Sequence, residues 1–275
     1  MPDDASPTAR TPRTASTVAT SHAPSAAPPA VHRVGHKGAD LIAPGNTLAS
    51  FDAALAARVD MVEFDVLSER ADGTGELFLA HDHRHLDGAP TLAQGLAHFA
   101  TDAFSDTQLD VDLKLPGYEA RVCDALREAG LAQRSLISTM EEQSLPVVRA
   151  AAPEIRLGWS VPKVRRNPLS HPLTRPLAVA GIAYARRVFP PRVLARVRAG
   201  EIDAVMSHWA LVDRRFAAAI RDAGADLYVW TVDDLTLLRR LEAMPGVTGI
   251  ISNDPRLFDA ATPDPAPTSR RRWRR

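Results

Sequence analysis

The chain alternates between short apolar runs and longer amphipathic segments from about residue 31 to residue 258. The short runs are bounded by turn residues, which predicts strands, and the longer segments carry apolar residues at helical spacing. The predicted strands are 31–36, 61–67 with a continuation at 77–81, 108–114, 135–138, 156–160, 204–207, 226–231 and 249–251. The predicted helices are 47–58, 91–101, 118–129, 140–151, 212–223 and 233–244. About eight strands alternating with helices predict a parallel sheet closed into a (β/α)₈ TIM barrel, as a single domain over residues 31–260.

Three segments depart from this rhythm. Residues 1–30 are rich in Ala, Pro, Ser and Thr and poor in large apolar side chains, so we expect a disordered tail. Residues 261–275 combine prolines with an arginine run around Trp273 and are expected to form a basic flexible tail. Residues 162–200 follow the fifth strand and are long, basic and rich in proline. This insert is interpreted either as a packed element or as a lid over the active-site end of the barrel that touches lipid headgroups.

The composition narrows the function classes. Lys and Arg together number 33 and Asp and Glu 33, so the net charge is zero, which argues against a general nucleic-acid binder. Neither a secretory leader nor an apolar run of about 18 residues is present, so we expect a cytoplasmic protein. Peripheral membrane contact would come through the insert or the basic tail. The single cysteine, Cys123, falls in a helical pattern and is expected to fill the core.

An acidic strand lies between two histidines. Glu63 and Asp65 are separated by one residue, so they share one face of their strand, and apolar residues occupy the other face. A buried acidic face is costly without a cation, and carboxylate oxygens suit Mg²⁺ or Ca²⁺. His36 and His81 flank this strand and would supply a general acid and a general base near neutral pH. The pattern indicates metal-assisted cleavage of a phosphate ester.

Seven short segments at strand ends carry a family resemblance: 35–40 (Gly-His-Lys-Gly-Ala-Asp), 43–51, 62–66, 79–82, 111–114, 230–233 and 246–255. In this order they resemble the glycerophosphodiester phosphodiesterase family over roughly residues 31–258. The resemblance implies a (β/α)₈ barrel that cleaves glycerophosphodiesters to glycerol 3-phosphate and an alcohol, with one divalent cation.

The resemblance also assigns site residues. It implies that His36 and His81 are the catalytic pair and that Glu63, Asp65 and Asp112 bind the metal ion. It further implies that the substrate is bound by Lys37, Lys114 and Trp230. His208 and Trp159, near later strand ends, are additional candidates for lining the pocket, and Asn46 is interpreted as the N-cap of the first helix.

Some positions depart from the family pattern. Lys37 replaces the usual arginine and lacks its two-pronged fork, Gly45 replaces a glutamate, and Asp112 replaces the more common glutamate. The segment between His81 and Pro90 is short, so the roof of the pocket would come from the insert. Three alternatives stay open: a lipid-directed enzyme acting on lysophospholipids, a sphingomyelinase D-type phospholipase, and a non-catalytic phosphate-binding barrel.

Overall fold

Eight parallel strands close into a barrel in the computed structural model, which describes residues 31–162 and 175–260. The strands are β1 (His32–Gly35), β2 (Met61–Ser68), β4 (Gln108–Leu113), β5 (Ser135–Thr139), β6 (Arg156–Val161), β7 (Ala204–His208), β8 (Asp226–Trp230) and β9 (Gly249–Ser252). Each pairs in parallel with the next, and β1 pairs with both β2 and β9. The first and last strands therefore meet, and the predicted (β/α)₈ architecture is confirmed.

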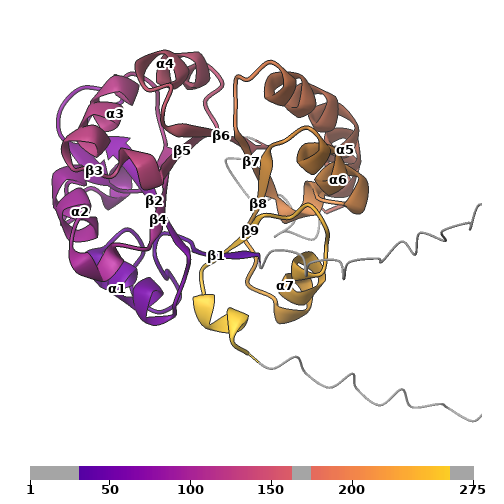
Figure 1. Cartoon of the computed structure of the whole chain (residues 1–275), viewed down its shortest axis with the longest axis horizontal. Coiled ribbons are helices and arrows are strands. Elements are labelled where there is room, and N and C mark those ends of the chain that lie inside the picture. The colour runs from indigo at the N-terminus through magenta and orange to yellow at the C-terminus, as the bar shows by residue number, and fades with distance from the viewer. Residues whose placement is uncertain (1–30, 163–174, 261–275) are drawn as a thin grey trace, which may run out of the picture.

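The helices lie outside the barrel in chain order (Figure 1). They are α1 (Leu48–Ala56), α2 (Leu92–Phe99), α3 (Glu119–Glu128), α4 (Ser144–Ala151), α5 (Arg175–Arg198), α6 (Arg214–Asp222) and α7 (Leu235–Glu242). Thr47 and Thr91 begin α1 and α2 with reciprocal capping boxes, which satisfy backbone N–H groups of the first turn. Thr47, and not Asn46, is thus the N-cap of α1. None of the helices in the described ranges is both long and apolar enough to cross a bilayer.

A ninth strand, β3 (Leu77–Leu79), runs antiparallel to β2 and is not part of the closed barrel. The sequence predicted it as a continuation of the preceding strand. A turn that contains Gly73 and Gly75, both with positive φ, reverses the chain before β3 begins. Leu79 pairs with Val66, so the residues that follow β3 are carried back toward the carboxyl end of β2.

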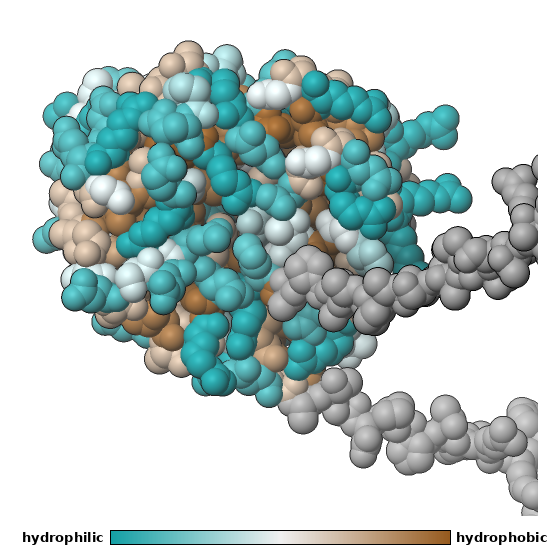
Figure 2. All heavy atoms as spheres, in the orientation of Figure 1, coloured by the Kyte–Doolittle hydropathy of each residue, from teal (hydrophilic) through white to brown (hydrophobic). Residues whose placement is uncertain are grey.

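Strand alternation divides the apolar residues into two cores. Val62, Phe64 and Val66 on β2 point outward and belong to the large cluster between barrel and helices. A smaller cluster fills the barrel interior and contains Val34, Met61, Leu136, Ala204, Met206, Tyr228 and Ile251. Figure 2 shows polar residues over much of one outer face, with apolar residues visible between them. Because Glu63 and Asp65 alternate with the outward residues, their side chains enter the barrel.

The described part of the 162–200 insert is mainly α5, which lies beside α6 in the outer ring (Figure 1). Val193 and Val197 are buried in the main core, so the C-terminal half of this helix is a packed element of the barrel. The helix runs through Pro190 and Pro191, although two prolines remove two backbone donors. Residues 163–174 and the two predicted tails, 1–30 and 261–275, lie outside the described residues.

Candidate active site

Three carboxylates converge at the carboxyl ends of two neighbouring strands. Glu63 and Asp65 lie on β2 and Asp112 lies on β4, where Asp65 is directly opposite Asp112 in the parallel register. One oxygen from each of the three side chains lies within 4.8 Å of the others. All three residues are buried. The structure thus brings together the three acids that were predicted to bind a metal ion, at the end of the barrel where TIM-barrel active sites form.

Two lysines approach the same acids. The Lys114 ammonium forms ion pairs with both Asp65 and Asp112. Lys37 Nζ lies 4.0 Å from Asp65 Oδ2, and the Lys37 backbone N–H donates to Glu63 Oε2 over 2.7 Å. Both lysines that were predicted to bind the substrate therefore lie beside the acid cluster. Three carboxyl groups thus face two ammonium groups in this cluster.

Burial and these charges set the protonation of the cluster. Burial and the Asp65 charge raise the pKa of Glu63 well above its usual value. Burial acts in the same direction on Asp65, but Lys114 and the bond with His81 outweigh it and hold the pKa of Asp65 well below its usual value. Burial raises the pKa of Asp112 against the opposing effect of Lys114. Asp112 and Asp65 hold the pKa of Lys114 well above its usual value despite burial. The cluster carries more carboxylates than its own lysines neutralise.

The donor set fits a divalent cation. Asp112 Oδ1 is buried and has no hydrogen-bond partner in the structure. An orphaned carboxylate oxygen beside two further carboxylates is a site for a hard cation, because such ions take oxygen ligands and remove the cost of an unpaired buried charge. Glu63, Asp65 and Asp112 are the residues that would hold the ion.

His36, one residue beyond β1, lies at the edge of this cluster. Its Nδ1 is 2.5 Å from Asn253 Oδ1, and its Nε2 is 3.8 Å from Glu63 Oε2. Burial and the charge of Lys37 lower the pKa of His36 to about 4. The ring is therefore neutral at pH 7, and its Nε2 is the nitrogen that faces the acids.

His81 reaches the cluster from β3. It follows Leu79 by two residues, and its Nδ1 lies 3.1 Å from Asp65 Oδ2. About half of its side chain is exposed. The two histidines thus face two different acids of the cluster; the His36 ring is partly buried, and the His81 ring is open to solvent.

Residues 36–112, which contain these two histidines and three acids, match the model of the Glycerophosphoryl diester phosphodiesterase family. The resemblance to this family that the sequence indicated is confirmed over these residues. The enzyme class expected from the sequence, a phosphoric diester hydrolase, is confirmed with it. The chain is 23% identical over 266 residues to a glycerophosphodiester phosphodiesterase of Arabidopsis thaliana, with 83% of this chain and 72% of the relative covered.

Solved structures described as phosphodiesterases share the fold. A putative glycerophosphoryl diester phosphodiesterase of Silicibacter pomeroyi is 22% identical, with a TM-score of 0.60 and coverage of 84% of this chain and 95% of the other. A phosphodiesterase of Oleispira antarctica, solved in complex with the product sn-glycerol-3-phosphate, is 20% identical, with a TM-score of 0.57 and coverage of 84% and 98%.

Two asparagines that position site residues were not predicted to do so from the sequence. Asn46 Nδ2 donates to Asp65 Oδ2 over 2.8 Å, and Asp65 N donates to Asn46 Oδ1 over 2.9 Å. Asn46 therefore fixes a proposed metal ligand, while the helix cap assigned to it from the sequence belongs to Thr47. Asn253, which follows β9, holds His36 and is bonded in turn to Asp233. Both asparagines lie in segments that carry the family resemblance, 43–51 and 246–255, but nothing local to either segment indicated these contacts.

The three candidates for lining the pocket, Trp230, His208 and Trp159, lie on different sides of the barrel wall. Trp230 ends β8 and His208 ends β7, where they are register partners, and their rings meet edge to face with centroids 5.1 Å apart. Trp159 instead alternates out of the barrel. It packs against Phe189 of α5, and the Arg196 guanidinium lies 5.0 Å from its ring centroid. Trp159 therefore packs in the outer layer, where it also lines a cavity of about 350 Å³ with Phe189 and Arg192 of α5. Of these three side chains, His208 and Trp230 are the two that end strands at the barrel mouth.

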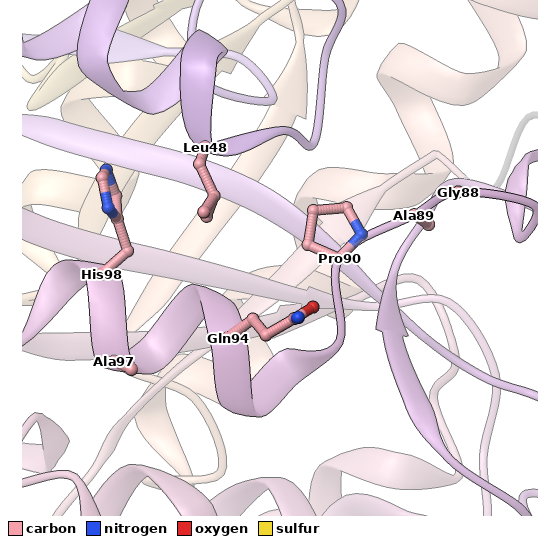
Figure 3. Close-up of a pocket in the computed structure, with 7 residues that line it drawn as sticks. All are labelled: Leu48, Gly88, Ala89, Pro90, Gln94, Ala97 and His98. Carbon is pink, nitrogen blue, oxygen red and sulfur yellow. The ribbon is translucent and has the colours of Figure 1, made fainter.

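A surface groove of about 720 Å³ lies outside the barrel between α1 and α2 (Figure 3). It is lined by Leu48 of α1, by the loop residues Gly88, Ala89 and Pro90, and by Gln94, Ala97 and His98 of α2. None of the predicted site residues lines it. The acid cluster inside the barrel, and not this groove, is the candidate active site.

Proposed function

We propose that the protein hydrolyses small glycerophosphodiesters to glycerol 3-phosphate and an alcohol, with one divalent cation and with His36 and His81 as the proton-transfer pair. The observation that supports this most directly is the convergence of Glu63, Asp65 and Asp112 within 4.8 Å, with a histidine on each side. The solved Oleispira relative holds sn-glycerol-3-phosphate as its product, which is the product proposed here.

Each side chain has a separate part in the proposed reaction. Glu63, Asp65 and Asp112 would hold Mg²⁺ or Ca²⁺, which supplies Lewis-acid stabilisation of a phosphate oxygen when bound. Lys37 and Lys114 attract the anionic phosphodiester to the barrel mouth and offset charge that grows at phosphorus. One histidine takes a proton from the attacking oxygen, and the other protonates the leaving alcohol. Trp230 offers its ring to the glycerol end of the substrate.

We place deacylated diesters before lysophospholipids as substrates. In the described part of the insert, the C-terminal half of α5 is packed into the barrel wall through Val193 and Val197, so these apolar side chains are not available to bind lipid. Release of choline or ethanolamine should be measured from glycerophosphodiesters and, separately, from the matching lysophospholipids. Turnover confined to the lysolipids would contradict this order.

His36→Ala and His81→Ala should each reduce turnover of a glycerophosphodiester by about 10²–10⁴-fold, because each removes one proton-transfer group. His98→Ala is the matched control, since His98 lies on α2 and pairs with Asp52 outside the barrel. Circular dichroism checks that all three variants remain folded. A His36→Ala or His81→Ala protein with near-parental turnover would refute the two-histidine scheme.

Removal of divalent ions with a chelator should abolish hydrolysis, because the site then lacks the Lewis acid that stabilises the charge growing on the phosphate oxygens. Addition of Mg²⁺ and of Ca²⁺ in separate titrations should identify the ion that restores it. Isothermal titration calorimetry on the Asp112→Asn variant provides a second readout, since loss of one ligand should weaken ion binding. Full activity in the chelated protein would rule out the proposed metal site.

A further inference from the structure

A continuous chain of hydrogen bonds links His36 to a carboxylate that is not part of the acid cluster. His36 Nδ1 lies 2.5 Å from Asn253 Oδ1, and Asn253 Nδ2 donates to Asp233 Oδ2 over 2.7 Å. Asn253 follows β9, and Asp233 follows β8 and precedes α7. Three neighbouring strand ends, those of β1, β9 and β8, are therefore joined through this chain.

The chemistry of these groups fixes where the protons lie. The Asp233 carboxylate is an acceptor, so the Asn253 amide must turn its NH₂ group toward Asp233 and its carbonyl oxygen toward His36. A carbonyl oxygen only accepts hydrogen bonds, so His36 Nδ1 carries the hydrogen. In the neutral ring Nε2 then has the free lone pair, and Nε2 is the nitrogen that faces Glu63 Oε2 at 3.8 Å.

The backbone holds this arrangement rigidly. Asn253 N donates to Asp233 Oδ1 over 2.8 Å, so the backbone and the side chain of Asn253 grip the two oxygens of one carboxylate. Ser252 Oγ also donates to Asp233 Oδ1, and His36 N donates to Ser252 O over 2.9 Å. Leu41 N donates to Asn253 O over 3.0 Å. With these bonds in place, the amide of Asn253 has one orientation that satisfies its partners.

We infer that Asn253 and Asp233 are positioning residues that hold His36 in the Nδ1–H tautomer and thereby make His36 the proton acceptor of the reaction. This assignment rests on the proposed phosphodiesterase function. As the bond from the attacking oxygen to phosphorus forms, that oxygen's proton passes to His36 Nε2. As the bond from phosphorus to the leaving oxygen breaks, the leaving oxygen takes a proton from His81. Proton exchange with water then restores both rings.

The tautomer can be tested without any activity. In long-range ¹H–¹⁵N spectra of the metal-free protein, His36 should show a protonated Nδ1 and an unprotonated Nε2, with His36→Gln used to assign the signals. Asp233→Asn frees the Asn253 amide to turn, so this variant should show a mixed or reversed His36 tautomer. A wild-type ring protonated at Nε2 alone would overturn the inference, whether or not the protein hydrolyses glycerophosphodiesters.

Kinetics provide the second test. Asp233→Asn and Asn253→Leu should lower kcat by about 10²-fold or more with little change in KM, because the wrong nitrogen then faces the reacting atoms. The double variant Asp233→Asn with Asn253→Asp restores an acceptor toward His36 and a donor in place of the carboxylate. The kcat of the double variant should be at least about tenfold higher than that of Asp233→Asn alone.

Asp254→Asn is the matched control, because Asp254 lies beside this chain of bonds but pairs with Arg256. It should leave kcat unchanged. Near-parental kcat in folded Asp233→Asn and Asn253→Leu would overturn the positioning role, and so would a double variant no better than Asp233→Asn. Should Asn253→Leu not fold, Asp233→Asn and the wild-type spectrum decide the question. A wild-type protein without hydrolase activity would instead refute the proposed function and leave the spectrum as the test.

Discussion

Asn46 combines a left-handed backbone with a two-point grip on a proposed metal ligand. Its φ is 60°, a conformation that asparagine and glycine accept more readily than other residues. This backbone turns the side chain inward, where its amide group pairs with the side chain and the backbone N–H of Asp65. The residue therefore determines where a metal-binding oxygen lies without being a ligand itself.

Asn46→Gly should weaken binding of the divalent cation by about 10–100-fold, because partners that orient a ligand commonly contribute that much to metal affinity. Glycine keeps the positive φ, so the change removes only the side chain. Competition with a fluorescent chelator measures the affinity. Thr47→Ala is the control: it removes the cap of α1 at a cost of about 1 kcal/mol in the free energy of unfolding. If Asn46→Gly binds the ion as tightly as the parent does, Asn46 does not position Asp65 for metal binding.

At the level of elements, β4 carries two inward carboxylates, of which only Asp112 belongs to the metal cluster. Asp110 lies two residues earlier, is buried, and has no hydrogen-bond partner at Oδ1. Burial raises the pKa of this carboxyl to about 8; a bond with Ser138 opposes the shift and the charge of Asp112 adds to it. β4 therefore contains, below the site, a buried carboxyl group whose ionisation is unfavourable.

Asp110→Asn should stabilise the metal-free protein more at pH 8 than at pH 5. Between the unfolded value of 3.8 and the folded value of about 8, the folded state holds a proton that the unfolded state has released. Raising the pH through this window therefore lowers the free energy of unfolding, at most by about 1.4 kcal/mol per pH unit. Asparagine does not ionise, so it avoids this loss of stability. In a chelating buffer at pH 8, the melting temperature of Asp110→Asn should therefore be several degrees higher than that of the parent.

Asp106→Asn is the comparison variant, because Asp106 is exposed in the loop before β4. Its melting temperature should follow the parent at both pH values. If the melting temperature of Asp110→Asn also follows that of the parent from pH 5 to pH 8, the Asp110 carboxyl does not hold a proton in the folded protein over this range.

The strands were predictable because period-two alternation and flanking turns mark them locally, and all eight barrel strands lie within a few residues of their predicted places. Contacts between distant segments were not. The pairing of His36 with Asn253 spans 217 residues, and nothing near either residue indicates it. A helix that runs through Pro190 and Pro191 was not predicted for a related reason, since burial of Val193 and Val197 outweighs a local helix-breaking signal.

In the whole molecule, one core joins the beginning and the end of the barrel. The large apolar cluster contains residues from Ala39 to Phe258. β1 pairs with β9, and Asp259 forms ion pairs with Arg33 at 2.9 Å and with Arg58 at 3.0 Å. Because β1 is hydrogen-bonded to β2 on one side and to β9 on the other, loss of either pairing opens the barrel. We therefore expect residues 31–260 to unfold as one cooperative unit.

Cys123 offers a direct test of that cooperativity. Its side chain on α3 is fully buried, and burial raises the pKa of its thiol to about 11, so in the folded protein at pH 8 it is both inaccessible and protonated. An aromatic disulfide reagent should leave it unmodified until the barrel opens. In urea, the midpoint of Cys123 modification should coincide with the midpoint of the loss of helical circular dichroism, and Cys123→Ala should abolish the thiol signal. Modification at clearly lower urea would show that α3 separates from the barrel before the remaining elements unfold, because a thiol at this depth reacts only after its helix has moved.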